Sequence, residues 1–176
     1  DETFLQNPRH ARGVIDALRR RGMTFTCTSR VDRLLGRVAE LRELGLVNVY
    51  IGVESLSDAS LESVKKGESS AQTVALLEEL RRNGSFAFGT YMIGFETDTP
   101  ERVLEDVEKL GHLEALYGVV FWITTPFPRT PYYQRLEAAG LISDHEPCHY
   151  DALHLVWKHP HMTPDQAREL LVACVR

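Results

Sequence analysis

Four short apolar runs alternate with amphipathic segments along the chain, and this alternation limits the possible fold more than any other feature. The runs lie at 24–28, 47–53, 86–93 and 118–124 and are rich in β-branched and aromatic residues, which favour strands. The segments between them carry apolar residues at helical spacing and end at glycines. Strands that alternate with helices of this length form βαβ units, so we predict an α/β fold with a parallel sheet.

Capping signals indicate where the helices begin. A polar residue followed by a proline starts four of them, at Pro8, Pro100, Pro131 and Pro164. We predict helices at 8–22, 31–44, around 58–64, 70–83, 99–110, 130–139 and from 162 to the end. Residues 153–157 are expected to form a further short strand.

The domain organisation follows from the same pattern. No glycine-rich dinucleotide or phosphate-binding loop follows a predicted strand, which leaves a barrel, a partial barrel or an open sheet. We predict that residues 1–140 form a parallel βα partial barrel of the TIM type and that residues 141–176 form a small helical cap. Residues 1–4 have the polar character of a strand exit, so we expect further chain upstream and exposed apolar surface along residues 23–28.

Composition excludes several classes of protein. The chain is 43% hydrophobic and 26% charged, which is globular, and its net charge of -5 lacks the basic footprint of a nucleic-acid-binding protein. No apolar run is long enough for a membrane helix. The three cysteines are far apart, which suits a reducing, cytoplasmic compartment. Their distance also excludes a local metal-binding loop of cysteines, and the seven histidines show no ligand pattern. We therefore expect no metal site, no membrane partner and no nucleic-acid partner.

Polar residues follow the predicted strands at the point where each one ends. Because chemistry in parallel βα barrels gathers at the carboxyl ends of the strands, these residues are the candidate site. They are Ser29 and Arg30 after the first strand, Glu54 and Ser55 after the second, Glu96 after the third, and Thr124 and Thr125 after the fourth.

Five segments of the chain, in order, resemble those of radical S-adenosylmethionine enzymes that carry an upstream cobalamin-binding domain. The resemblance runs from residue 1 to residue 131, and residues 159–164 are similar to the C-terminal cap of the family. The matching segments are Asp1 to Pro8, Thr28 to Asp32, Tyr50 to Ser55 (a GxES motif), Tyr91 to Phe95, and Thr125 to Pro131.

The resemblance implies a role for each candidate residue in binding S-adenosylmethionine. Glu2 (or Asp1) would accept from the ammonium group, Ser29 and Arg30 would hold the carboxylate, and Glu54 would accept from the ribose hydroxyls with Ser55 beside it. Thr124 and Thr125 would contact the adenine. The resemblance assigns no catalytic residue.

Each of these residues also has a purely structural interpretation. Arg30 could pair with Asp32 or Glu54, and Ser55 could cap the helix near 58–64. Glu2 could cap the first helix, and the two threonines could shape the turn before a proline.

The resemblance further implies a 4Fe–4S cluster and cobalamin, with the cluster ligands and the cobalamin domain outside this chain. The implied reaction is radical methyl transfer to an unactivated carbon or phosphorus of a small-molecule or peptide substrate. Flavodoxin or ferredoxin would supply electrons, and the upstream part of the polypeptide would be a partner. The alternatives are a radical enzyme without cobalamin, of the methylthiotransferase or ring-forming type, and a non-catalytic ligand-binding remnant.

Two departures from the family pattern qualify these roles. The CxxxCxxC loop that holds the family's cluster is absent from the sequence. Arg129 stands where the family has a glycine, and residues 96–98 replace its PGE segment, so the assignment of Glu96 is weaker than that of Glu54.

Overall fold

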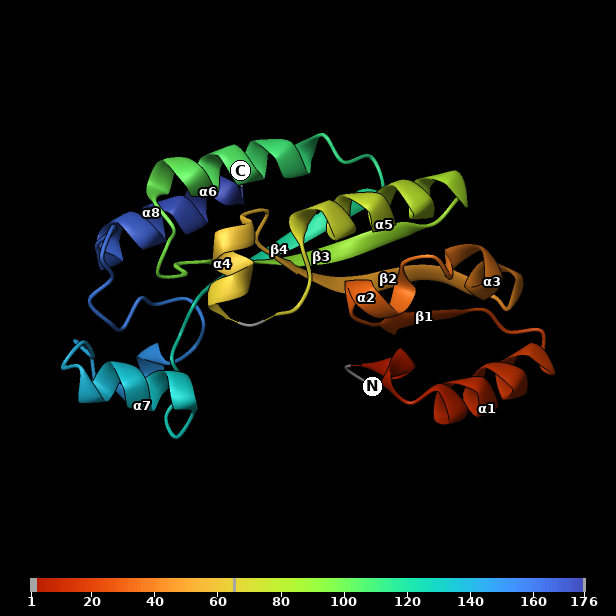
Figure 1. Cartoon of the computed structure of the whole chain (residues 1–176), viewed down its shortest axis with the longest axis horizontal. Coiled ribbons are helices and arrows are strands. Elements are labelled where there is room, and N and C mark those ends of the chain that lie inside the picture. Colours follow the sequence, from red (N-terminus) through yellow and green to blue (C-terminus); the bar gives the residue numbers. More distant parts are fainter. Residues whose placement is uncertain (1–2, 65, 176) are drawn as a thin grey trace.

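A four-stranded parallel sheet forms the centre of the molecule (Figure 1). The computed structural model describes residues 3–64 and 66–175. The strand order equals the chain order, and all three pairings are parallel. The strands are β1 (Phe25–Thr28), β2 (Leu46–Glu54), β3 (Phe86–Ile93) and β4 (Leu116–Ile123). The predicted α/β fold and its four strands are confirmed.

Helices follow the strands in the expected alternation. Their starts bear out the capping signals, since Asn7, Thr99 and Thr130 each accept a hydrogen bond from a backbone N–H of the first turn. The helices are α1 (Pro8–Arg19), α2 (Val31–Leu34), α3 (Val38–Glu43), α4 (Asp58–Ser63), α5 (Ser70–Arg82), α6 (Pro100–Gly111), α7 (Pro131–Ala138) and α8 (Pro164–Cys174), with 3-10 turns η1 (Phe4–Gln6) and η2 (Pro147–His149).

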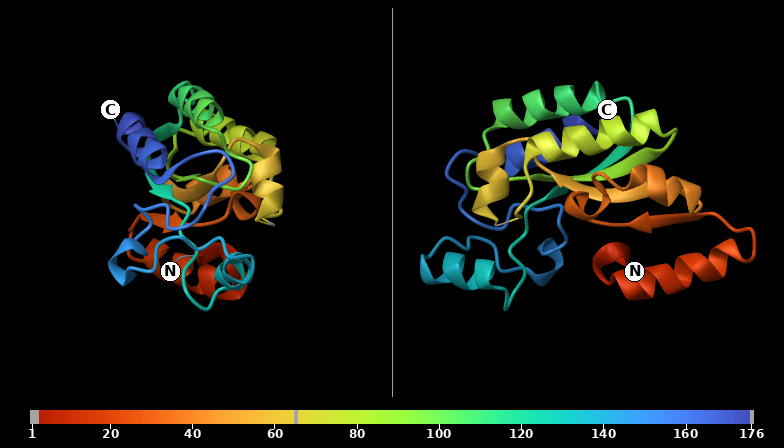
Figure 2. Two further views of the ribbon diagram at one scale, coloured as in Figure 1. Left: turned by 90° about the vertical axis from the view of Figure 1, so that its left-hand side faces the viewer. Right: turned by 45° about the vertical axis from the view of Figure 1, so that its right-hand side comes forward.

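The two faces of the sheet differ in their surroundings. Figure 2 shows α5 and α6 lying together over one face. Strand β3 alternates accordingly, with Ala87, Tyr91 and Ile93 buried beneath the helices. The other face carries aromatic rings, and there the Tyr50 side chain is 49% exposed and stacks on Phe88 at a centroid distance of 5.2 Å. This open face meets the candidate site at the carboxyl ends of the strands.

The predicted continuous helix over 31–44 is wrong, because two short helices, α2 and α3, occupy that segment. Gly36 separates them with a φ of 79°, in the left-handed region where a side chain is disfavoured. The Glu79 carboxylate of α5 accepts hydrogen bonds from the N–H groups of Gly36 (2.7 Å) and Val38 (2.9 Å). Glu79 therefore caps α3 from a different helix.

The C-terminal segment packs onto the sheet without adding a strand to it. The short strand predicted at 153–157 is wrong, since only an isolated antiparallel bridge joins Trp157 to Ile142. Trp157 and, in α8, Leu170 belong to the same apolar core as the sheet. Helix α8 also contacts α6. The boundary predicted at 140/141 stays a prediction.

Strand β1 lies at one end of the sheet. In the described part of the chain no strand pairs with its outer side, as expected, and Met23 is 51% exposed. The expected apolar exposure is nevertheless wrong for Phe25 and Cys27, because both face the core and are buried. Phe4 covers Phe25 at a ring-centroid distance of 6.0 Å. None of the helices within 3–64 and 66–175 has the length and apolar character that crossing a bilayer requires.

Glu79→Ala should lower the free energy of unfolding by about 1–2 kcal/mol, because α3 loses its cap and two backbone N–H groups lose their acceptor. Glu78→Ala is the matched control, since the Glu78 side chain is 52% exposed and pairs only with exposed Arg81 among the described residues. Urea unfolding of both variants measures the difference. Equal losses in the two variants would contradict the capping role.

His159 should make stability depend on pH. Its Nε2 hydrogen-bonds to the Phe95 carbonyl (2.8 Å), and its Nδ1 accepts from the His161 N–H (3.1 Å), an arrangement that requires the neutral ring. Burial lowers the pKa of His159. The unfolded chain therefore binds more protons between the folded-state pKa and the ordinary value of about 6.5, so stability rises with pH across that window.

The measurement is urea unfolding of the native protein and of His159→Gln at about pH 5.5 and about pH 7.5. The native protein should exceed the variant by a larger margin at the higher pH. A margin that does not change with pH would show that His159 titrates alike in the folded and unfolded states.

Candidate functional site

The candidate site begins at a strained turn where β2 ends. Glu54 has a φ of 63°, which side chains other than glycine adopt at a cost. The register with β3 shifts between Gly52 and Glu54, and the N–H of Ser55 bonds to the Val53 carbonyl at 2.8 Å. The turn sends the Glu54 carboxylate over the open face of the sheet and turns Ser55 in towards the helices.

A cavity of about 300 Å³ lies beneath Glu54 at the carboxyl ends of β1 and β2. Its wall is partly aromatic, because Tyr50 and Phe88 line it from the open face of the sheet. Its polar lining includes Ser29, Arg30, Glu54 and Lys66. The candidates Ser29, Arg30 and Glu54, which come from two different strand ends, are thus brought together around one cavity.

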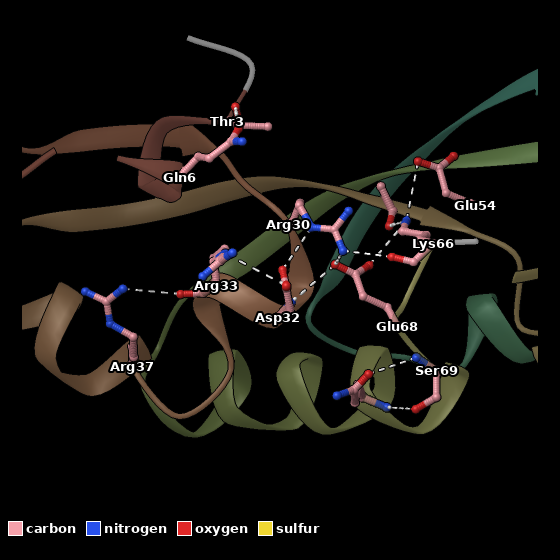
Figure 3. A network of polar contacts seen from close by, with 12 residues as sticks. Thr3, Gln6, Arg30, Asp32, Arg33, Arg37, Glu54, Lys66, Glu68 and Ser69 are labelled. Carbon is pink, nitrogen blue, oxygen red and sulfur yellow. Dashed lines mark hydrogen bonds and ion pairs between the residues drawn. The ribbon is translucent and has the colours of Figure 1, made fainter. Parts of the chain in front are cut away.

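Three residues of the cavity lining, Arg30, Glu54 and Lys66, belong to an ion-pair network (Figure 3). Lys66 lies between two carboxylates, with its Nζ 3.4 Å from Glu54 and 3.5 Å from Glu68, and it also contacts the carbonyl of Gly52. Arg30 pairs with Asp32 at 3.0 Å and with Glu68 at 3.1 Å. Since the Glu68 side chain is only 1% exposed, losing either cation would leave a poorly compensated buried charge.

Lys66 and Glu68 were not predicted from the sequence. They lie in the loop between α4 and α5, separated by Gly67, which has a φ of 71°. A charged loop beside a glycine is usually a solvated turn. The available signal was that this loop follows the Glu54 turn after only one short helix.

The structural alternatives for two candidates can now be assessed. Of the two structural partners considered for Arg30, Asp32 pairs with it, whereas Glu54 pairs with Lys66. Ser55 does not line the cavity and does not cap α4, because Ser57 is the capping residue. The Ser55 hydroxyl instead faces Asp106 (3.4 Å) on the helix side of the sheet.

The two threonines after β4 also lie away from the cavity. Thr125 donates to the backbone carbonyls of Ile123 (3.2 Å) and His154 (3.3 Å), so its hydroxyl holds the chain in place. Thr124 is buried, and its hydroxyl has no hydrogen-bond partner among the described residues. Ser29 Oγ has none either within the same part of the chain. Glu2 lies outside the described residues.

After β3, Asp98 and not the candidate Glu96 accepts the hydrogen bonds that hold the loop in place. Asp98 is 1% exposed and accepts from the N–H groups of Gly94 and Phe95, both at 2.9 Å. It also accepts from the Ser60 hydroxyl at 2.8 Å, which ties this loop to α4. Burial raises the pKa of Asp98. Glu96 contacts the exposed Arg135 and does not line the cavity.

These groups define which ligand the cavity can accept. The Glu54 carboxylate can receive hydrogen bonds from hydroxyl or ammonium groups, and Lys66 and Arg30 can face an anion. The aromatic wall suits an apolar or planar part of the same ligand. Across 3–64 and 66–175, no three His, Cys, Asp or Glu side chains are grouped as a metal centre requires.

Comparison with known proteins identifies the family of the chain. The family model described as the Radical SAM superfamily matches residues 1–110. An uncharacterized methyltransferase of Pyrococcus horikoshii is 30% identical over 174 residues, which are 97% of this chain and 38% of that protein. Bacteriochlorophyllide d C-8(2)-methyltransferase of Chlorobaculum tepidum is 29% identical over 93% of this chain and 37% of its own length.

The fold has solved counterparts as well. The radical S-adenosylmethionine methyltransferase TsrM of Kitasatospora setae, solved with cobalamin and a 4Fe–4S cluster bound, superposes with a TM-score of 0.67 and 19% identity. That match covers 96% of this chain and 36% of TsrM, so the chain spans less than two fifths of each of these proteins. Since the family match extends over more than half of its residues, the chain belongs to the Radical SAM superfamily.

Proposed function

We propose that this chain is the S-adenosylmethionine-binding part of a cobalamin-dependent radical methyltransferase, and that Glu54 and Lys66 hold the cofactor in their shared cavity. The observation that carries the proposal is the pairing of Glu54 with Lys66 (3.4 Å) above an aromatic wall at the carboxyl edge of a radical SAM sheet. The names of the Pyrococcus and Chlorobaculum relatives support methyl transfer over the methylthiotransferase and ring-forming alternatives.

The cavity offers a complementary group for each charged or polar part of S-adenosylmethionine. Glu54 would accept from the two ribose hydroxyls, and Lys66 and Arg30 would face the carboxylate. Ser29 Oγ, which has no partner among the described residues, would donate to the same carboxylate. An acceptor for the ammonium group is proposed at Glu2, and adenine contacts are proposed near Thr124 and Thr125, outside the cavity.

The remaining cofactors would be held outside the cavity. The described residues offer no ligand set for a 4Fe–4S cluster, so we propose that cysteines elsewhere in the polypeptide bind it. When bound, the cluster supplies the electron that cleaves S-adenosylmethionine. A cobalamin domain belongs to the same proposal, supported by the cobalamin bound in TsrM. A flavodoxin-like or ferredoxin-like electron donor and a small-molecule or peptide substrate are proposed with it.

The residues of this chain would contribute binding and orientation. Glu54 and Lys66 would fix the two ends of the cofactor relative to the sheet, which sets the direction in which its adenosyl group points. The aromatic wall formed by Tyr50 and Phe88 would exclude water from one side of that group.

Glu54→Gln tests the proposed ribose contact. The substitution keeps the shape and removes the charge, and hydrogen bonds to a charged acceptor contribute about 1.5–3 kcal/mol each. We expect S-adenosylmethionine to bind at least about tenfold more weakly, measured by calorimetric titration of the intact cluster-loaded protein, with an unchanged melting temperature. Glu62→Gln, on the exposed part of α4, is the control. Native affinity in Glu54→Gln would refute the role of Glu54.

Gly52→Ala tests whether the position of Glu54 matters as well as its charge. A Cβ at residue 52 would clash with Glu54 Oε1 and would lie 3.1 Å from Lys66 Nζ. Both atoms end flexible side chains, so the fold should survive while the carboxylate is displaced. We expect about tenfold weaker S-adenosylmethionine binding, since a displaced acceptor loses about 1.4 kcal/mol or more.

The control for this variant is Gly13→Ala, where an added Cβ has nothing within 4 Å. That variant should keep native affinity and gain stability, because alanine favours the helix interior. Equal affinity for the two glycine variants would indicate that the space around Glu54 is not needed for binding.

A further inference from the structure

The turn that carries Glu54 is fixed from behind, on the helix side of the sheet. A residue with a φ of 63° holds that conformation only where its surroundings impose it. The two residues after Glu54 are Ser55 and Leu56, and both are bonded to one side chain, Asp106 of α6. The side chain that fixes the turn therefore belongs to α6, and Asp106 lies 50 positions after its partner Leu56.

Asp106 accepts three hydrogen bonds through one oxygen. Its Oδ2 lies 2.9 Å from the Leu56 N–H, 3.0 Å from the Tyr91 hydroxyl and 3.4 Å from the Ser55 hydroxyl. Ser55 Oγ in turn accepts from the N–H of Ser57 (3.0 Å), which caps α4. One carboxylate thus connects α6, β3 and the loop between β2 and α4.

The burial of this carboxylate has no other evident function. Asp106 is 1% exposed, and its Oδ1 has no hydrogen bond among the described residues. Its nearest cation, Lys109 (3.5 Å), is 60% exposed and offsets little of the desolvation. Burial and Asp106 both raise the pKa of Tyr91, so its phenol stays protonated and continues to donate. From the far side of the sheet, this buried charge reaches the cavity through the turn and through Tyr91, which is the ladder partner of Glu54.

We propose that Asp106 is a positioning residue, which holds the Leu56 and Ser55 backbone so that the Glu54 carboxylate stays over the cavity. The inference rests on the proposed function, because it assigns Asp106 to the same ligand contact. Asp106 is not among the residues that line the cavity, and it is not a catalytic residue.

The first test compares three variants of the intact cluster-loaded protein. Asp106→Ala removes the acceptor and should weaken S-adenosylmethionine binding by about tenfold. Asp106→Asn retains an oxygen that can accept from Leu56 and Tyr91, so it should restore affinity to within about threefold of native. Val103→Ala, fully buried on the same helix but unconnected to the turn, should lower the melting temperature without changing affinity.

Hydrogen–deuterium exchange supplies a readout independent of the ligand. In Asp106→Ala, exchange should increase in the peptide over 53–58 and not in one over the first half of β3. If Asp106→Ala does not fold, Asp106→Leu replaces it, because leucine fills the space without accepting a hydrogen bond. Unchanged affinity or unchanged exchange at 53–58 in the folded variant would overturn the proposal.

A double-mutant cycle with Glu54→Gln separates this inference from the proposed function. If Asp106 acts through Glu54, the Asp106→Ala effect on affinity should disappear in the Glu54→Gln background. Additive losses would overturn the positioning role while leaving the ribose contact intact. No loss in Glu54→Gln alone would instead refute the proposed function.

Discussion

The parallel pairing of β2 with β3 is the constraint on which the rest of the structure depends. It runs in unbroken register from Asn48 to Gly52, so the two strands end at the same edge of the sheet. The register shift that follows skips Val53 and sets Glu54 opposite Tyr91, and the chain then turns across that edge. Pairing with β1 then brings Arg30 and Ser29 to the same place. The cavity is therefore a consequence of where the ladder stops.

Buried or half-buried carboxylates fix the loops around this edge. Glu79, Asp98 and Asp106 each accept hydrogen bonds from backbone N–H groups where the chain changes direction. Such charge-assisted bonds are stronger than those between neutral groups, and they satisfy donors that no helix or strand uses. At the end of β3, Gly94 (φ 97°) takes the left-handed conformation that Glu54 adopts at the end of β2. Of these two turns, the one at Glu54 places a charged side chain over the cavity.

The strands and most helix starts could be predicted from sequence because local periodicity and capping determine them. The break at Gly36 could not, since apolar residues keep helical spacing on both sides and the capping carboxylate is 43 positions away. The participation of Lys66 and Glu68 depends on how the loop after α4 folds back, which no local pattern encodes.

The resemblance places Ser55 beside Glu54 at the ligand, whereas in the structure its hydroxyl faces Asp106 on the helix side of the sheet. Consecutive residues at a strand end face opposite sides of a sheet, so a residue beside Glu54 was more suited to the helix face than to the cavity. Thr125 illustrates a different limit, because its hydroxyl donates to the backbone, including His154 of the C-terminal segment, whose path the sequence did not reveal.

The most direct test is a crystal structure of the intact cluster-loaded protein with S-adenosylmethionine. The account predicts ribose hydroxyls within hydrogen-bonding distance, about 2.5–3.0 Å, of the Glu54 carboxylate, and the cofactor's carboxylate facing Lys66. It also predicts that Glu54 keeps its left-handed backbone and that Asp106 keeps its bond to Leu56. Cofactor density elsewhere, with Glu54 still paired to Lys66 beside an empty cavity, would contradict it.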